Sequence, residues 1–126
     1  FEYDAADNLT AFVDGLGRRT ESTYDAVGNL VAVTLPDPDG AGGQLAPTMQ
    51  FTYDLLNRQT SATDPLGRTT DVVYERFGRT IKTIAPDHDG DGERSESVIL
   101  LKALGLAVSA TDPLGRTTTY AYDSLH

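Results

Sequence analysis

The chain has 126 residues, of which 39% are hydrophobic and 23% charged, with a net charge of −9. It is too apolar for a disordered tail and lacks the long apolar run of a membrane span, so we expect a folded protein without membrane insertion. The negative charge opposes phosphate backbones, so nucleic acid is not an expected partner. Without cysteine, disulfides and thiolate metal sites are excluded.

A recurring Tyr-Asp dipeptide divides the chain into units. Six marks are found, two of them variants: Tyr3-Asp4, Tyr24-Asp25, Tyr53-Asp54, Tyr74-Glu75, Leu101-Lys102 and Tyr122-Asp123. The tyrosines and Leu101 are 21, 29, 21, 27 and 21 residues apart, so short and long units alternate. The extra residues of the long units fall in acidic, Gly/Pro-rich inserts near 36–46 and 86–94, which we expect to be loops.

Each short unit is predicted to contain two strands and two turns. One turn follows the tyrosine mark and has Gly28 or Asn57 where a positive φ is easily adopted. The other is Asp-Pro-Leu-Gly, at 64–67 and 112–115. The residues between turns are rich in Thr, Val, Tyr and Ile, which favours strands. We therefore predict an all-β fold, an array of about ten to twelve antiparallel strands in hairpin order that forms a curved, open strip of sheet.

Alternation along these strands places the marks on one face. Phe1 and Tyr3, Phe51 and Tyr53, or Tyr120 and Tyr122 are two residues apart, and the intervening positions are mostly polar. We therefore expect one apolar, aromatic face and one solvated face. On the partner strands the alternation is weak, and the faces of 30–35 stay unassigned.

The segment 96–105 is ambiguous. By propensity alone it would form a short helix that ends at Gly105. The repeat alignment and the β-branched Val98 and Ile99 favour strand, turn and strand, and we predict that arrangement.

The Tyr-Asp-x-x-Gly mark, the Asp-Pro-Leu-Gly-Arg-Thr-Thr turn and the 21-residue spacing resemble the Rhs/YD repeat family over the whole chain, 1–126. The resemblance implies hairpins joined side by side into a hollow β-shell, as in bacterial polymorphic toxins, the cocoon subunits of insecticidal complexes and teneurins. It implies a secreted or surface location for the parent protein. Because the sequence starts without Met or an apolar leader and ends within a mark, we expect targeting signals outside this segment. Flanking repeats and an enclosed toxin are the expected partners, and the alternative is an adhesion module for a surface glycan or protein.

The marks are expected to form a structural ladder along the sheet. A lone hairpin is marginally stable, so neighbouring units must share burial, and tyrosine can pack its ring while its hydroxyl finds a partner. A carbohydrate-stacking surface is the alternative interpretation. The predicted ladder consists of Tyr3, Tyr24, Tyr53, Tyr74, Leu101 and Tyr122.

No catalytic constellation is found, and we expect no enzyme and no resident cofactor. Of the two histidines, His88 lies inside an acidic Gly-rich loop and His126 at the end of the segment, so no Ser/His/Asp or Cys/His constellation can be proposed. One acidic insert, Asp87-His88-Asp89-Gly90-Asp91-Gly92-Glu93, resembles part of a calcium loop, although Val98 stands where an EF-hand needs a bidentate Glu. The alternatives are a weak calcium site formed by Asp87, Asp89, Asp91 and Glu93, and a solvated loop. The sister insert at 37–43 lacks the third carboxylate.

Exposed surfaces of such a strip should attract partners. Edge strands offer unpaired backbone groups, and an uncovered aromatic face offers apolar area. We therefore expect self-association through an edge or through the tyrosine face.

Overall fold

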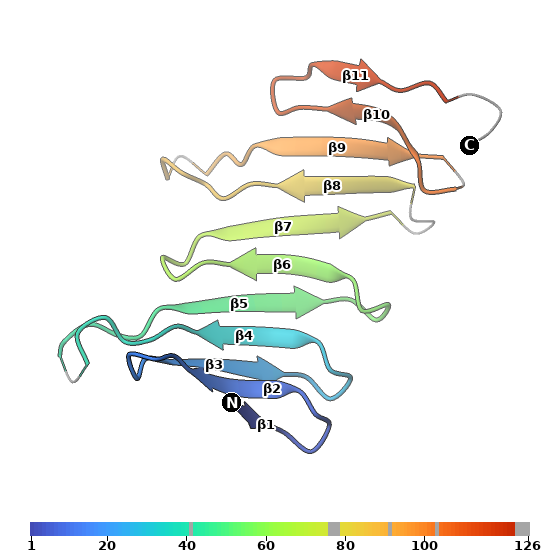
Figure 1. Cartoon of the computed structure of the whole chain (residues 1–126). Coiled ribbons are helices and arrows are strands. Elements are labelled where there is room, and N and C mark those ends of the chain that lie inside the picture. The colour runs from blue at the N-terminus through green and yellow to red at the C-terminus, as the bar shows by residue number, and fades with distance from the viewer. Residues whose placement is uncertain (41, 76–78, 91, 103, 123–126) are drawn as a thin grey trace. The chain divides into compact units, whose positions relative to one another are not determined.

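The computed structural model describes residues 1–40, 42–75, 79–90, 92–102 and 104–122 (Figure 1). These residues contain eleven strands and no helix, which confirms the all-β prediction. The strands are β1 (Glu2–Tyr3), β2 (Leu9–Val13), β3 (Arg19–Tyr24), β4 (Leu30–Thr34), β5 (Thr48–Tyr53), β6 (Gln59–Thr63), β7 (Thr69–Tyr74), β8 (Thr80–Ile84), β9 (Glu96–Leu101), β10 (Ala107–Thr111) and β11 (Thr117–Thr119).

The array predicted over 1–126 falls into two compact units, Phe1–Arg68 and Thr69–His126. In unit 1 the strands β1 to β6 pair antiparallel, each with the next in sequence. In unit 2 the strands β7 to β11 pair in the same way. The sequential hairpin order predicted from the repeats is confirmed within each unit. The ambiguous segment forms β9, so the repeat alignment was the correct guide and helix propensity was not.

The predicted alternation of faces is clearest in β3 and β5. Ser22 and Tyr24 are half-buried while Glu21 and Thr23 are exposed, and the same alternation holds for Phe51 and Tyr53 against Thr52. Strand pairing assigns the partner strand that alternation could not. Val33 lies between Ser22 and Met49, on the side of the sheet that carries the tyrosines.

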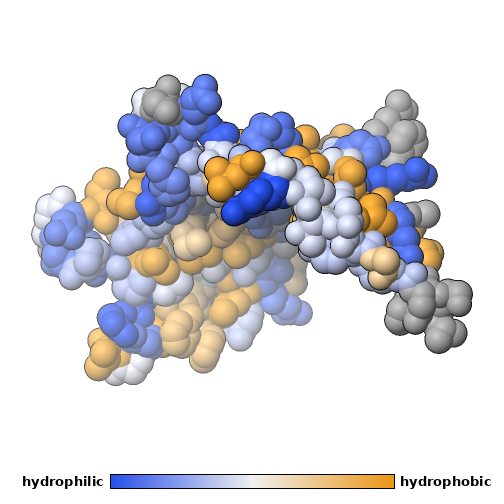
Figure 2. Space-filling view, turned by 90° about the horizontal axis from the view of Figure 1, so that it is seen from above, coloured by the Kyte–Doolittle hydropathy of each residue, from blue (hydrophilic) through white to orange (hydrophobic). Residues whose placement is uncertain are grey.

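Each sheet presents both of its faces without a covering layer in its own unit. Among the described residues, Ala11 is the one fully buried side chain, at 2% exposure. Its neighbours across the strands are Glu2 and Glu21, and Arg19 bonds both carboxylates, so this ion-pair bridge covers the small side chain. Figure 2 shows apolar side chains open at the surface beside hydrophilic ones. The described residues contain no helix suited to crossing a bilayer.

Candidate functional site

The turns are closed by an aspartate at their first position. Its Oδ1 accepts the backbone N–H groups two and four residues later, at 2.9–3.0 Å, and its Oδ2 accepts a side-chain N–H of the Asn or Arg at the fourth position. The Oδ2 partners are Asn8, Arg18, Asn29, Arg58, Arg68 and Arg116. The capping residues are Asp4, Asp14, Asp25, Asp54, Asp64 and Asp112.

The two kinds of turn that the sequence distinguishes share this geometry. In both, the backbone N–H of the Asp donates to the carbonyl four residues later, and the third residue after the Asp has a positive φ, as at Gly28, Asn57 and Gly67. From the sequence, Asp-Pro-Leu-Gly is predicted as a separate turn in which Pro fixes φ early and Gly supplies the strained position late. In the structure the Asp carboxylate and the positive φ define the turn, and Pro only occupies a compatible position.

The caps hold the aspartates ionised. Hydrogen bonds to the side chains of Asn8, Asn29, Arg58 and Arg68 are the largest cause that lowers the pKa of their respective aspartates. For Asp14 and Asp112 the largest cause is the backbone N–H of Arg18 and Arg116. Both contributions favour the charged carboxylate over the neutral acid. Four of the six turns are also ion pairs within themselves, so each of these turns is close to neutral.

One turn keeps its backbone geometry without a carboxylate. In the degenerate mark the N–H of Lys102 donates to the carbonyl of Leu106 at 2.9 Å, and the N–H of Gly105, with φ +77°, donates to the carbonyl of Lys102. The ammonium of Lys102 lies 4.6 Å from the ring centre of Tyr122, a cation–π contact. The Asp cap therefore stabilises a conformation that the backbone and the glycine already permit.

A β-bulge follows four of the turns that come after a mark. The register skips one residue on the strand that leaves the turn, at Thr10, Val31, Thr60 and Val108. The Asp-Pro-Leu-Gly turn of unit 2 and the pairings β2–β3 and β4–β5 show no such skip. A bulge interrupts the backbone ladder and leaves a polar group that needs another partner.

At three of these four bulges a tyrosine hydroxyl supplies that partner. Tyr24 donates to the carbonyl of Leu9 at 3.0 Å, Tyr53 to that of Leu30 at 2.9 Å, and Tyr122 to that of Ala107 at 2.8 Å. Each acceptor residue directly precedes a bulge residue. It lies beyond the end of the backbone pairing of β2 with β3, β4 with β5 or β10 with β11, so the next strand offers it no paired residue. Each of these tyrosines thus ties its strand to the bulge left by the preceding mark.

Leu101 shows what happens where the tyrosine is absent. After the preceding mark, Tyr74-Glu75, the N–H of Glu75 donates to the carbonyl of Thr80, five residues later, and the β7–β8 register runs without a skip. The ladder of β8 and β9 then continues, and the N–H of Leu101 donates to the carbonyl of Arg79. Where the bulge is missing, no bulge carbonyl requires a hydroxyl, so leucine suffices.

The six ladder positions differ in how far their side chains are exposed. Tyr24, Tyr53, Tyr74 and Leu101 are half-buried, while Tyr3 is 60% and Tyr122 38% exposed. Phe1, two residues before Tyr3, packs on Phe12 with ring centres 5.1 Å apart. The hydroxyl-to-bulge bond was not visible in the sequence, because the acceptor lies 15 residues from Tyr24 but 23 residues from Tyr53.

The acidic insert is organised around Asp87. Its carboxylate accepts the N–H groups of Asp89, Gly90 and Gly92 at 3.2, 2.7 and 3.0 Å, and the Gly90 bond is the largest cause that lowers its pKa. Asp91 lies outside the described residues. Within the described part of the chain, no three His, Asp or Glu side chains converge as metal ligands. The structure thus assigns Asp87 a role in the turn, and calcium binding stays a prediction.

Arg94 closes the same loop and was missed by the sequence analysis. Its guanidinium donates to the carbonyls of Ala85, Thr69 and Ile84 and to the carboxylate of Asp71, at 2.6–3.2 Å. It therefore fastens the base of the loop to β7 and β8. The sequence signal for this role was that Arg94 is the one arginine in an acidic insert, since a basic side chain among acidic ones often forms a fixed, charge-assisted hydrogen bond.

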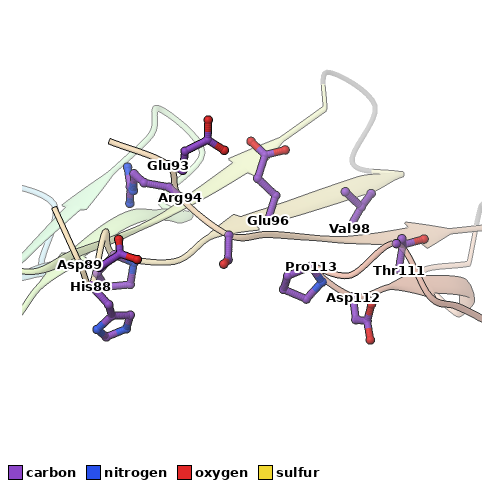
Figure 3. Close-up of a pocket in the computed structure, with 12 residues that line it drawn as sticks. His88, Asp89, Glu93, Arg94, Glu96, Val98, Thr111, Asp112 and Pro113 are labelled. Carbon is purple, nitrogen blue, oxygen red and sulfur yellow. The ribbon is translucent and has the colours of Figure 1, made fainter. Parts of the chain in front are cut away.

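An open groove of about 670 Å³ lies between this loop and the turn at 112–116. Figure 3 shows Glu93 and Glu96 pointing to one side of the chain and the ring of His88 to the other. The lining also includes Thr111 and Asp112. The lining of this groove is mainly polar.

Comparison with known families matches the chain to the RHS repeat. The family model covers residues 3–41 and 103–126, which together make up half of the chain. The matched segments include the marks at Tyr3, Tyr24 and Tyr122 and the turn at 112–116. No curated protein matches the chain.

The capped turns should make stability fall in acid. A carboxyl whose folded pKa is lowered contributes stability that is complete above its unfolded pKa, about 3.9 for Asp, and is lost as pH falls through the folded value. We expect the melting temperature to be level from about pH 7 to 5 and to fall below about pH 4. Asp64→Asn should melt lower at neutral pH, and its difference from the wild type should shrink in acid. A melting temperature unchanged in strong acid would contradict this role.

Replacing Arg94 should loosen the 85–95 loop. Arg94→Lys cannot reach four acceptors at once, so we expect a loss of about 1–2 kcal/mol of unfolding free energy. Amide exchange at Ala85, which donates to Ser95 across the loop base, should accelerate. Arg116→Lys is the control, because Arg116 pairs only inside its own turn and is largely exposed. Equal effects of both variants would argue against the clamp.

Calcium should bind the acidic loop weakly at most. The carboxylate of Asp87 already serves three N–H groups, so we expect an affinity no better than about 10⁻⁴–10⁻³ M. Calorimetric titration measures this calcium affinity. The double substitution Asp89→Ala and Asp91→Ala should abolish any binding, whereas the control Asp37→Ala, in the sister insert, should leave it unchanged. No heat at millimolar calcium would leave the solvated-loop alternative.

Proposed function

The chain belongs to the RHS repeat family, and from this membership we propose that it is a structural segment of a larger secreted or surface-exposed repeat protein. In this proposal its sheets form part of the wall of a β-shell that encloses a toxin. The membership and the all-β fold make it a structural repeat segment. Secretion, the shell and the cargo belong to the proposal.

The observation that carries the proposal is the tyrosine-to-bulge bond. The residues that define each repeat, the Asp, the glycine and the tyrosine, are used in forming the sheet itself. A binding site would need these side chains to be free for a ligand. Their shared use in hydrogen bonds between neighbouring strands supports a scaffold in which each repeat holds the next.

The same reasoning supports the absence of catalysis. RHS repeats are structural repeats, and the polar groups of the repeat bond to one another within the turns. We therefore propose that any enzymatic activity of the parent protein belongs to another part of it. The alternative of an adhesion module for a glycan or protein would place the function on exposed side chains instead.

Substitution of the tyrosines separates the two functions. Tyr53→Ala should lower the unfolding free energy by about 2–3 kcal/mol, and Tyr53→Phe, which removes only the bond to Leu30, by about 1 kcal/mol. Tyr3→Phe and Tyr3→Ala are the matched controls, and because Tyr3 is largely exposed they should be mild. Denaturant titration measures all four. Equally mild effects at both positions would remove the structural role and favour adhesion.

A further inference from the structure

The face of unit 1 that carries Tyr24 and Tyr53, here called the tyrosine face, has no charged side chain. The strands β1 to β6 are fully described and contain three charged residues, Glu2, Arg19 and Glu21. Glu2 and Glu21 flank Ala11 across the strands, and Arg19 bonds both of them, which places all three on the opposite face. The other charges of the described part of unit 1 lie in its turns and loops.

This face is largely apolar, with three polar side chains, Thr20, Ser22 and Gln59, among apolar ones. Its apolar and aromatic residues are Phe1, Tyr3, Leu9, Phe12, Tyr24, Leu30, Val33, Met49, Phe51, Tyr53 and Ala62, as strand register and alternation place them. Phe1 and Tyr3 are 75% and 60% exposed, and the strands beyond them are half-buried only by their own neighbours. Uncovered apolar area of this extent is typical of interaction surfaces.

Two tyrosine hydroxyls of this face would keep their hydrogen bonds if the face were covered. The hydroxyls of Tyr24 and Tyr53 already donate to Leu9 and Leu30 within the sheet. Burying a polar group is costly only when its hydrogen bond is lost, so these tyrosines can be covered by an apolar partner. A carbohydrate is a weaker fit, since the face has no carboxylate for sugar hydroxyls and these phenol groups are occupied.

The size of the face is adequate for a weak sheet-on-sheet contact. Strands β2 to β6 have five or six residues, and at about 4.8 Å between strands and about 3.4 Å per residue the face measures roughly 24 Å by 18 Å. Each face is thus roughly 430 Å² in area, and two such faces in contact would bury roughly 900 Å² in total, which is below the about 1,200 Å² of stable interfaces and is the size of a weak dimer contact.

We propose that the tyrosine face of unit 1 binds the same face of a second copy of this chain, so that the two sheets pack about 10 Å apart as a β-sandwich. Charge permits this pairing in spite of the net charge of −9. The acidic residues stay in the turns and on the outer faces, in water, where repulsion beyond about 10 Å is screened at 0.1 M salt. Four turns are also internally neutralised by Arg.

Sedimentation of the full chain between about 1 and 100 μM should show a concentration-dependent dimer. Met49→Lys puts a charge in the centre of the face and should weaken the dimer at least about tenfold. Gln50→Lys, on the adjacent residue that faces the other way and is exposed, is the matched control and should leave the dimer intact. Circular dichroism checks that both variants fold. A chain that stays monomeric over this range would overturn the proposal.

Cross-linking decides the matter even if Met49→Lys does not fold. The chain has no cysteine, so Met49→Cys introduces one thiol on the tyrosine face and Gln50→Cys one on the opposite face. A short bis-maleimide should link Met49→Cys into a dimer and leave Gln50→Cys unlinked. Equal linking of both, or association that persists in Met49→Lys, would show pairing at an edge and refute the proposal. The proposal would also be refuted if the chain stayed monomeric, bound a glycan array and lost this binding in Met49→Lys.

Discussion

The hydrogen bond from a tyrosine hydroxyl to the carbonyl beside a β-bulge is the interaction on which the repeat depends. A bulge would leave a backbone carbonyl without a ladder partner, and at three of the four bulges a tyrosine brings the donor from the next repeat. The bond joins one hairpin to the next, which a hairpin's own turn cannot do. Leu101 supports this interpretation, because there the bulge and the tyrosine are lost together.

The turns meet a second constraint, the high content of acidic residues. A chain with net charge −9 must place its carboxylates where they do not repel one another in the sheet. Here six of them cap turns, where backbone N–H groups and an Asn or Arg four residues later take up the charge. The strands are thereby left almost free of charge, and in unit 1 one face is wholly so.

A sheet with two open faces and one fully buried residue among those described is held together by backbone pairing and by bonds between neighbours. Such a construction extends readily by adding units, because each strand contacts mainly the next in sequence. It suits a wall or scaffold, and it leaves apolar area that a second sheet can cover. These properties agree with the family membership, and they support both the proposed scaffold and the proposed pairing of faces.

The sequence alone determined the strands, their order and the face that carries the marks, because hairpin repeats depend on local turns and on alternation, which are written in neighbouring residues. It also identified the tyrosines and the acidic insert.

Tertiary structure decided what these residues do. Val33 was assigned to a face by strand register, and the bulge partners of Tyr24 and Tyr53 lie 15 and 23 residues away. Arg94 likewise reaches Asp71 and Thr69 across two strands. Asp87 accepts backbone N–H groups, a role that the pattern of acidic residues alone does not predict. Such bonds depend on which strands become neighbours in space, so local sequence pattern could not specify them.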